Sequence, residues 1–318
     1  MVDALTSRLG TRFLVVTVVP NVLLVAYVGF LLATGAPTHS PSLARALMVL
    51  DGLTIRQIVA IFLGLLIISV ATHPLQTPLI QLVEGYWWGL PFGAVAADRF
   101  TERFRNELRR TRNELQRVQG IKNMDWATVQ AADDADDRQF WLPERERDLL
   151  PTALGNTLKT GEIRAGSRYG LELDFALPRL TPLMSPSSLA ELSDRRNQLD
   201  AAVRLCLAAG LATAVGVGLL LWHGPWLFLA LVTYLLCWAC YRAAVAAARG
   251  FSISLAAAID LHHLQLFDAL QLERPTNLAQ ELELNKTLGM LFRDEPLRKK
   301  AKDDLRYIAP EADKPAAE

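Results

Sequence analysis

Residues 203–249 read VRLCLAAGLATAVGVGLLLWHGPWLFLALVTYLLCWACYRAAVAAAR. Two uncharged apolar runs, 205–222 and 226–241, flank a short turn that contains Gly224 and Pro225. With its small flanking residues each run has about 18–20 residues, enough helix to cross a hydrocarbon core of ~30 Å. Backbone polar groups in lipid must be satisfied within the segment, so the two runs predict a helical hairpin in a membrane. Trp222 and Trp226 flank the turn, where interfacial aromatic side chains are common.

Small residues recur along both runs at intervals of four. They predict close van der Waals packing between the two helices, which is the main attraction available in lipid. An alanine-rich composition is the competing explanation. The predicted packing residues are Gly210, Ala214 and Gly218 on the first run, with Ala208, Ala212 and Gly216 on a parallel row, and Ala239, Ala243 and Ala247 on the second run.

The composition predicts membrane spans combined with sizeable parts in water. The 318 residues are 51% hydrophobic and 21% charged, and the mean hydropathy is +0.20. Equal numbers of basic and acidic residues, 33 of each, leave no net charge to attract nucleic acid. The three cysteines, Cys206, Cys237 and Cys240, lie inside the apolar runs, which excludes a secreted disulfide framework and favours a packing role.

Two further spans are predicted in the first part of the chain, at about 13–33 and 55–75. The first follows Arg8 and Arg12 and is longer than the apolar region of a cleaved signal peptide, ~7–15 residues. Pro20 near its middle removes a helix hydrogen bond and predicts a kink.

Residues 75–90 carry one continuous apolar stripe at helical spacing, so they predict an amphipathic helix in the headgroup plane or under the bundle. Three aromatic residues lie at the end of this helix: Tyr86, Trp87 and Trp88. A re-entrant segment is the alternative. It would bring His73 and Glu84 near the bilayer interior, where ionisable groups are functional by default.

Residues 98–122 are strongly basic and predict a helix that leaves the bilayer. Arg99, Arg103 and Arg110 are candidates for contact with anionic lipid headgroups. The other interpretation is a solvated face with pairing between residues four apart. Interleaved acidic residues argue against nucleic-acid binding. Residues 133–137, with four aspartates, are expected to form a solvated linker and lack the pattern of a calcium loop.

A small, mainly helical insert is expected at 141–186. Pro151 begins a helix as a first-turn proline. Residues 171–177 alternate enough for a short strand, and prolines in 177–183 oppose regular structure. A capping box from Ser188 to Glu191 starts a helix that continues into the third span.

Several short motifs resemble a pattern found in uncharacterised bacterial polytopic membrane proteins. Glu84-Gly-Tyr-Trp87 is one of the motifs similar to that family, and the resemblance covers about the middle half of the chain. It implies a bacterial inner-membrane location and no particular chemistry. The other motifs are Leu150-Pro-Thr-Ala-Leu-Gly-Asn156, Glu162-Ile-Arg164, Arg168-Tyr-Gly170, Pro178-Arg-Leu180 and Gln198-Leu-Asp200.

The C-terminal region is predicted to be two helices, 251–272 and 277–292, followed by a disordered tail at 309–318. Asp260 and His263 share a helix face at the spacing of a metal pair, but no third ligand follows. His262 and His263 are therefore expected at a helix contact or the lipid boundary, and no metal or cofactor is predicted.

These observations predict an all-α protein with four transmembrane helices in two hairpins. Basic residues gather before the first span, after the second, before the third and after the fourth, so both termini and the 98–204 region are expected in the cytoplasm. The expected divisions are 1–97, 98–187, 188–249 with spans at about 204–222 and 226–245, 250–308 and 309–318.

Three functional hypotheses follow. The first is a non-enzymatic membrane anchor or scaffold that presents a cytoplasmic domain to a protein partner, as a homo-oligomer or alone. The second is a channel or transporter subunit with a pore lined by small residues. The third is a membrane-bound enzyme, although no P-loop, nucleophile elbow or metal-spaced histidine cluster is found in the sequence.

Overall fold

The structure is a computed structural model that describes residues 18–71, 76–118, 125–294 and 305–307. Over these residues the chain is helical, and its extended structure is an isolated bridge between Leu272 and Tyr307. The all-α prediction is confirmed. The helices are α2 (Val19–Ala33), α3 (Leu43–Asp51), α4 (Ile55–Ala71), α5 (Gln76–Glu84), α6 (Gly93–Val118), α7 (Trp126–Phe140), α8 (Ala153–Ser167), α9 (Leu173–Leu180), α10 (Pro186–Leu220), α11 (Phe228–His262), α12 (Gln265–Ala269) and α13 (Leu278–Phe292), with 3-10 turns η3 (Glu146–Asp148), η4 (Thr181–Leu183) and η5 (Gly224–Leu227).

The chain divides into two compact units. Unit 1 comprises Met1–Asn106, Leu150–Gly155 and Arg195–Ala248, and unit 2 comprises Glu107–Leu149, Asn156–Asp194 and Arg249–Glu318. The 35-residue helices α10 and α11 contribute residues to both units. The helix expected to continue from the Ser188 region into the third span is present as α10.

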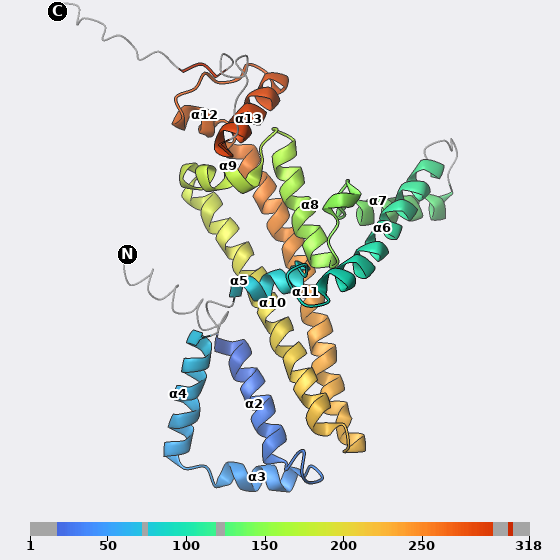
Figure 1. The fold of residues 1–318 in the computed structure, drawn as a ribbon, viewed down its shortest axis with the longest axis vertical. Helices are drawn as coiled ribbons and strands as arrows, with labels where there is room; N and C mark the ends of the chain where they lie inside the picture. Colours follow the sequence, from blue (N-terminus) through green and yellow to red (C-terminus); the bar gives the residue numbers. More distant parts are fainter. Residues whose placement is uncertain (1–17, 72–75, 119–124, 295–304, 308–318) are drawn as a thin grey trace, which may run out of the picture. The chain divides into compact units, whose positions relative to one another are not determined.

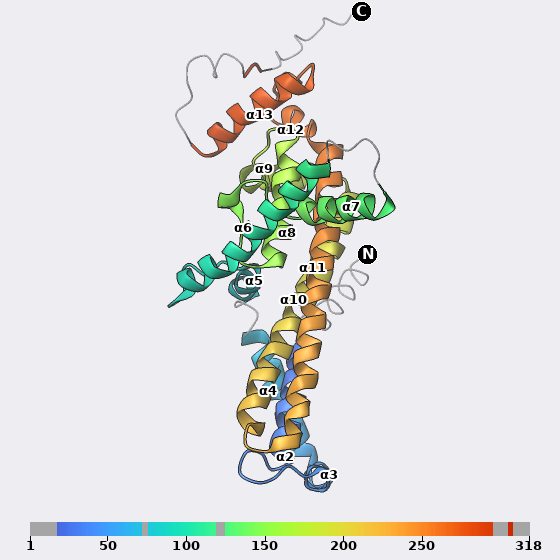
Figure 2. The same cartoon turned by 90° about the vertical axis from the view of Figure 1, so that its right-hand side faces the viewer.

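In unit 1, α10 and α11 form an antiparallel hairpin closed by η5, and they lie side by side in both views (Figures 1 and 2). Both helices are long and apolar enough to cross a membrane. Thr213 Oγ1 donates to Thr233 Oγ1 across the pair at 3.0 Å, and the sulfur atoms of Cys206 and Cys237 are 3.8 Å apart. The predicted hairpin is therefore present.

The hairpin seam includes part of the predicted rows: Ala212 and Gly216 of the parallel row are buried on α10. Gly210 faces Cys237, but Ala214, Gly218, Ala239 and Ala243 are exposed. Steps of four residues turn 400° around a helix, so a strict i, i+4 row drifts out of a contact that alternating steps of three and four keep in place. The buried residues of α10 follow such steps: Leu199, Val203, Cys206, Ala209, Ala212, Gly216 and Leu220.

The first helices of unit 1 differ from two full-length spans. The described part of α2 has 15 residues, and Pro20 lies in its first turn, where a proline is tolerated. Helix α4 has 17 residues, and α3 meets its first part at 102°, as a broken span or a re-entrant loop would. The described residues therefore contain two to three candidate membrane-crossing helices, not clearly four.

The end of α2 packs on the closed end of the hairpin. Leu31, Ala36 and Leu220 form a buried cluster with Trp226 against it. His223 Nε2 and the carbonyl oxygen of Pro37 are 2.8 Å apart. The loop after α2 and the hairpin turn therefore belong to the same end of unit 1.

Unit 2 has its own apolar core, centred on Leu180, Ile259, Phe267 and Leu288. The strand predicted at 171–177 is wrong: the segment belongs largely to α9, with Leu173, Ala176 and Leu180 buried on one face. Pro178 lies inside α9, whose 8 residues leave a proline few hydrogen bonds to break.

Two other local predictions change. The aspartates of 133–137 lie within α7, where Asp125 caps the first turn and only Ala135 of the helix is buried. Solvated aspartates thus occupy the exposed face of a helix instead of a linker. The helix expected to start at Ser188 starts earlier, because Ser185 Oγ accepts from the Ser188 amide. The helix expected at 277–292 is α13, and Asn277 caps it by accepting from the Gln280 amide.

Candidate functional site

In unit 1 the backbone at the end of α5 packs closely against the start of α8, and this contact is called the junction. A Cβ on Gly155 would lie 2.0 Å from the Glu84 carbonyl oxygen, and one on Gly85 would lie 2.6 Å from Pro151 Cγ. Thr152 Oγ1 donates to the same Glu84 oxygen at 2.6 Å. The Glu84 and Leu150 motifs of the sequence, more than sixty residues apart, therefore meet backbone to backbone.

Tyr241 on α11 completes this junction. Its hydroxyl oxygen accepts from the amides of Ala153 (3.1 Å) and Leu154 (3.4 Å), and Thr152 Oγ1 accepts from Gly155 N (3.0 Å). These bonds satisfy amides of the first turn of α8 that have no partner within the helix. The junction is thus a capped helix start held on α5 and α11.

The junction also ends the predicted amphipathic helix. Gly85 has φ +101°, a left-handed conformation that terminates helices, so α5 stops at Glu84 and 85–90 is a loop. The single helix predicted for 75–90 is therefore wrong in its second part. Trp87 is half-buried against Phe100, whereas Tyr86 and Trp88 are exposed.

Glu84 and His73 are the two ionisable residues that a re-entrant segment would bring near the bilayer interior, and the structure describes Glu84. Glu84 is half-buried at the C-terminal end of α5, next to the junction. His73 lies outside the described residues.

In unit 2, His263 belongs to a polar network. Its Nδ1 is 2.5 Å from Glu281 Oε1 on α13, and Glu281 is only 5% exposed. The His263 ring stacks on Tyr169 at 3.9 Å between centroids. Burial and the hydrogen bond to Asp260 raise the pKa of Tyr169, so its phenol stays protonated and donates to Asp260 Oδ1 at 2.9 Å.

His262 and Asp260 have separate partners. His262 is buried, its Nε2 accepts from the Ser185 amide at 3.0 Å, and its Nδ1 lies 2.8 Å from the Ala258 carbonyl oxygen. Asp260 pairs with Arg168 at 3.0 Å. Asp260 and His263 therefore bond to different groups. Within the described ranges, no group of three His, Cys, Asp or Glu residues is placed to hold a metal ion.

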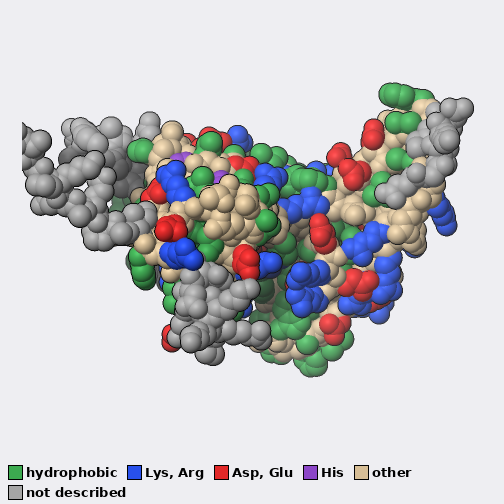
Figure 3. Space-filling model, turned by 90° about the horizontal axis from the view of Figure 1, so that it is seen from above, with side chains coloured by type: hydrophobic (Ala, Val, Ile, Leu, Met, Phe, Trp, Pro, Cys, Tyr) green, Lys and Arg blue, Asp and Glu red, His purple; other side chains and the backbone are tan. Residues whose placement is uncertain are grey.

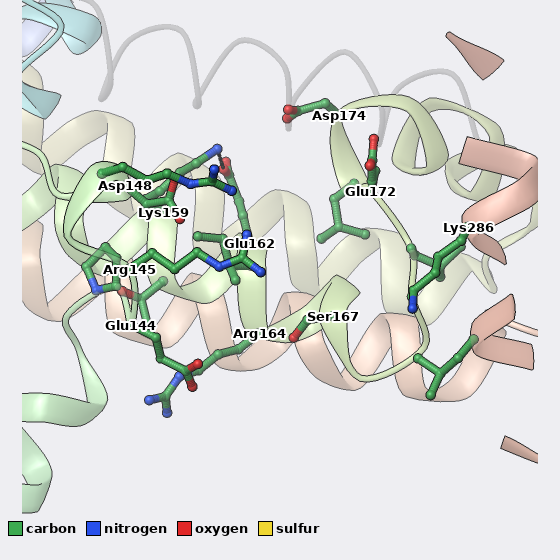
Figure 4. A pocket seen from close by; sticks show the side chains of 18 of the residues that line it. Glu144, Arg145, Asp148, Lys159, Glu162, Arg164, Ser167, Glu172, Asp174 and Lys286 are labelled. Atoms are coloured by element: carbon green, nitrogen blue, oxygen red, sulfur yellow. Dashed lines mark ion pairs between the residues drawn. The ribbon is translucent and has the colours of Figure 1, made fainter. Parts of the chain in front are cut away.

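A charged groove of about 540 Å³ lies on unit 2 between the η3 segment, α8, the start of α9 and α13. Figure 4 shows Arg145 and Lys286 entering it from opposite ends, with Glu172 and Asp174 along one wall. Ion pairs join Lys159 to Glu162 and Arg293 to Glu172. Among the described residues, Lys286 and Arg145 have no ion-pair partner, so the groove holds unused cations beside exposed carboxylates.

The headgroup candidates lie on α6. Arg99, Arg103 and Arg110 are exposed, and the structure gives them no carboxylate partner among the described residues. Arg109 pairs with Glu146 at 3.0 Å, which fixes the other face of the helix. Acidic and basic side chains are interspersed over the face drawn in Figure 3.

Comparison with protein families, with characterised proteins and with solved structures finds no match for this chain. Sequence reasoning missed the groove because its lining comes from four separate segments. The junction had a usable signal in Gly85 and Gly155, since glycine permits close backbone approach.

Proposed function

We propose that this protein is a non-enzymatic membrane anchor whose unit 2 presents a charged docking groove to a partner protein in the cytoplasm. One observation carries the proposal: the two helices that are apolar enough to cross a bilayer also supply the core of the folded polar unit. Leu255 and Ile259 of α11 lie in that core, and Leu189 of α10 packs against it.

The groove favours a protein partner over a small molecule. Most small-molecule pockets are mainly apolar with a few polar groups, whereas this one has many charged side chains, among them Arg145, Lys286 and Asp174, beside apolar ones such as Leu171 and Leu173. A partner segment with charges of both signs would complement such a surface, giving specificity through matched potentials.

The proposed membrane arrangement has four crossings with both termini in the cytoplasm of a bacterial cell. Its support is the apolar sequence of 13–33 and 55–75, together with the arginine distribution. The loop after α2 and the hairpin turn pack together, which suits an arrangement with both outside. A homo-oligomer formed through the exposed row of Ala214 and Gly218 is compatible with this arrangement.

Site-specific photocrosslinking in intact cells tests the proposal. A photoreactive amino acid at Asp174, in the groove wall, is expected to give a discrete adduct with another protein. The adduct should be lost when Lys286→Glu reverses a groove charge. The matched control places the same amino acid at Asp133, an exposed aspartate of α7 in the same unit. No adduct at Asp174, or the same adducts at Asp133, would exclude the groove as the docking site.

A further inference from the structure

A surface in unit 1 combines exposed aromatic side chains with arginines that have no carboxylate partner among the described residues. It comprises Trp88, Phe92, Val95, Arg99 and Arg103 and is called the 88–103 surface. Phe92 is 89% exposed and Val95 is 71% exposed. Val95, Arg99 and Arg103 are four residues apart in α6, so their side chains share one face, and Phe92 directly precedes the helix.

The loop that carries these aromatics is held rigidly. Gly93 lies so close to the Trp87 carbonyl that a Cβ would approach its oxygen to 1.9 Å. Trp87 Nε1 donates to the Leu82 carbonyl at 2.6 Å, and its ring meets Phe100 edge to face. Phe92 has φ +61°, a conformation that bulky residues rarely adopt. The contacts of Gly93 and Trp87 therefore hold an exposed aromatic ring in a conformation that costs energy.

We infer that the 88–103 surface binds the anionic headgroup layer of the bilayer on the cytoplasmic side. Aromatic rings favour the boundary between acyl chains and headgroups, and arginines next to that boundary attract anionic phosphates. In the described structure Arg99 and Arg103 have no carboxylate partner, whereas Arg105 pairs with Glu102. The helix thus reserves one arginine face for an external anion.

Continuity with the membrane-associated part of the chain favours a lipid surface over another anionic partner. Leu79 and Leu82 of α5, which precede the loop, are also exposed, as is Leu90 within it. Exposed apolar side chains therefore precede the arginines in both α5 and the loop. This inference rests on the membrane location proposed above.

Lipid analysis of the purified full-length protein tests it. The protein is reconstituted in vesicles of equal phosphatidylcholine and phosphatidylglycerol, extracted in mild detergent, and the retained lipids are quantified. We expect phosphatidylglycerol enrichment, decreased about fivefold for each arginine removed in Arg99→Gln/Arg103→Gln. The control Arg179→Gln/Arg274→Gln removes the same charge from exposed positions elsewhere and should retain the enrichment. Equal enrichment in Arg99→Gln/Arg103→Gln would overturn the inference.

A second measurement covers the case in which that variant does not fold. A fluorophore on Phe92→Cys, in a chain whose native cysteines are replaced by alanine, should be quenched by a lipid-attached nitroxide and shielded from iodide. Strong iodide quenching in anionic vesicles would contradict a lipid contact. If a carbonate wash removes the chain from the membrane fraction, the proposed membrane location is wrong as well. Strong iodide quenching without such release contradicts the lipid contact alone.

Discussion

Gly85 and Gly155 allow two distant segments of unit 1 to meet without side chains between them. The Glu84 carbonyl lies where a Cβ of residue 155 would be, and the Pro151 ring lies where a Cβ of residue 85 would be. Because both obstacles are backbone or a rigid ring, neither can rotate away. The identity of these two residues therefore determines whether α8 can start on α5.

Gly155→Ala should destabilise the protein by about 1–3 kcal/mol, the usual cost of overpacking. The new methyl would lie 2.0 Å from a carbonyl oxygen, so the junction must open. Thermal denaturation in detergent, followed by size-exclusion chromatography, measures the effect. Gly29→Ala on α2 is the control, since a Cβ there meets nothing within 4 Å. Equal melting temperatures for the two variants would show that the close approach does not determine stability.

A double-mutant cycle on His263 and Glu281 should give a coupling of roughly 0.5–3 kcal/mol. The pair is largely buried, with side chains 15% and 6% exposed, so truncating one partner leaves the other with an unmet hydrogen bond.

The exposed pair Arg274–Asp268, with side chains 58% and 41% exposed, provides the comparison. Exposed pairs are typically worth about 0–1 kcal/mol because water and salt screen them. If the His263–Glu281 coupling does not exceed that of the exposed pair, the polar network does not hold α11 to α13.

Among the elements, the hairpin of α10 and α11 is the best test of how far sequence patterns extend. Its existence and turn follow from two uncharged runs, because lipid leaves a helix as the only solution for each. Its seam does not follow, since small residues occur on several rows of both helices. Contacts such as Thr213–Thr233 depend on how the helices cross, which a single helix does not determine.

Disulfide crosslinking separates the two seams. In a cysteine-free chain, the pair Thr213→Cys/Thr233→Cys should crosslink rapidly with a mild oxidant, because the native hydroxyl oxygens are 3.0 Å apart. The pair Gly210→Cys/Ala239→Cys, which lies at a similar level of the hairpin on the predicted row, should react more slowly because Ala239 is exposed. The mobility of the protein on a non-reducing gel measures the crosslinking of both cysteine pairs. The opposite result would restore the predicted row as the contact.

Other elements show where local patterns compete with tertiary packing. Residues 171–177 alternate like a strand, yet Leu173, Ala176 and Leu180 at steps of three and four bury one face of α9 in unit 2. The two histidines singled out in the sequence show the same limit of local patterns. The sequence places His262 and His263 at a helix contact or the lipid boundary, but it does not identify their partners Ser185 and Glu281, which come from segments that no spacing rule connects to them.

For the whole molecule, the central claim is that two long helices join a membrane hairpin to a folded polar unit. Each of α10 and α11 has residues in the apolar window and residues in unit 2. The proposed orientation places the hairpin turn outside the cell and unit 2 inside, because arginines are abundant near 195–204 and 242–249 and absent from the turn.

Cysteine labelling of intact cells tests this claim most directly. In a chain with Cys206, Cys237 and Cys240 replaced by alanine, single cysteines are introduced as Trp222→Cys at the hairpin turn and Lys286→Cys in unit 2; both native residues are exposed. A membrane-impermeant maleimide should label Trp222→Cys in intact cells and Lys286→Cys only after permeabilisation. Labelling of Lys286→Cys in intact cells, or recovery of the protein in the soluble fraction without detergent, would contradict the account.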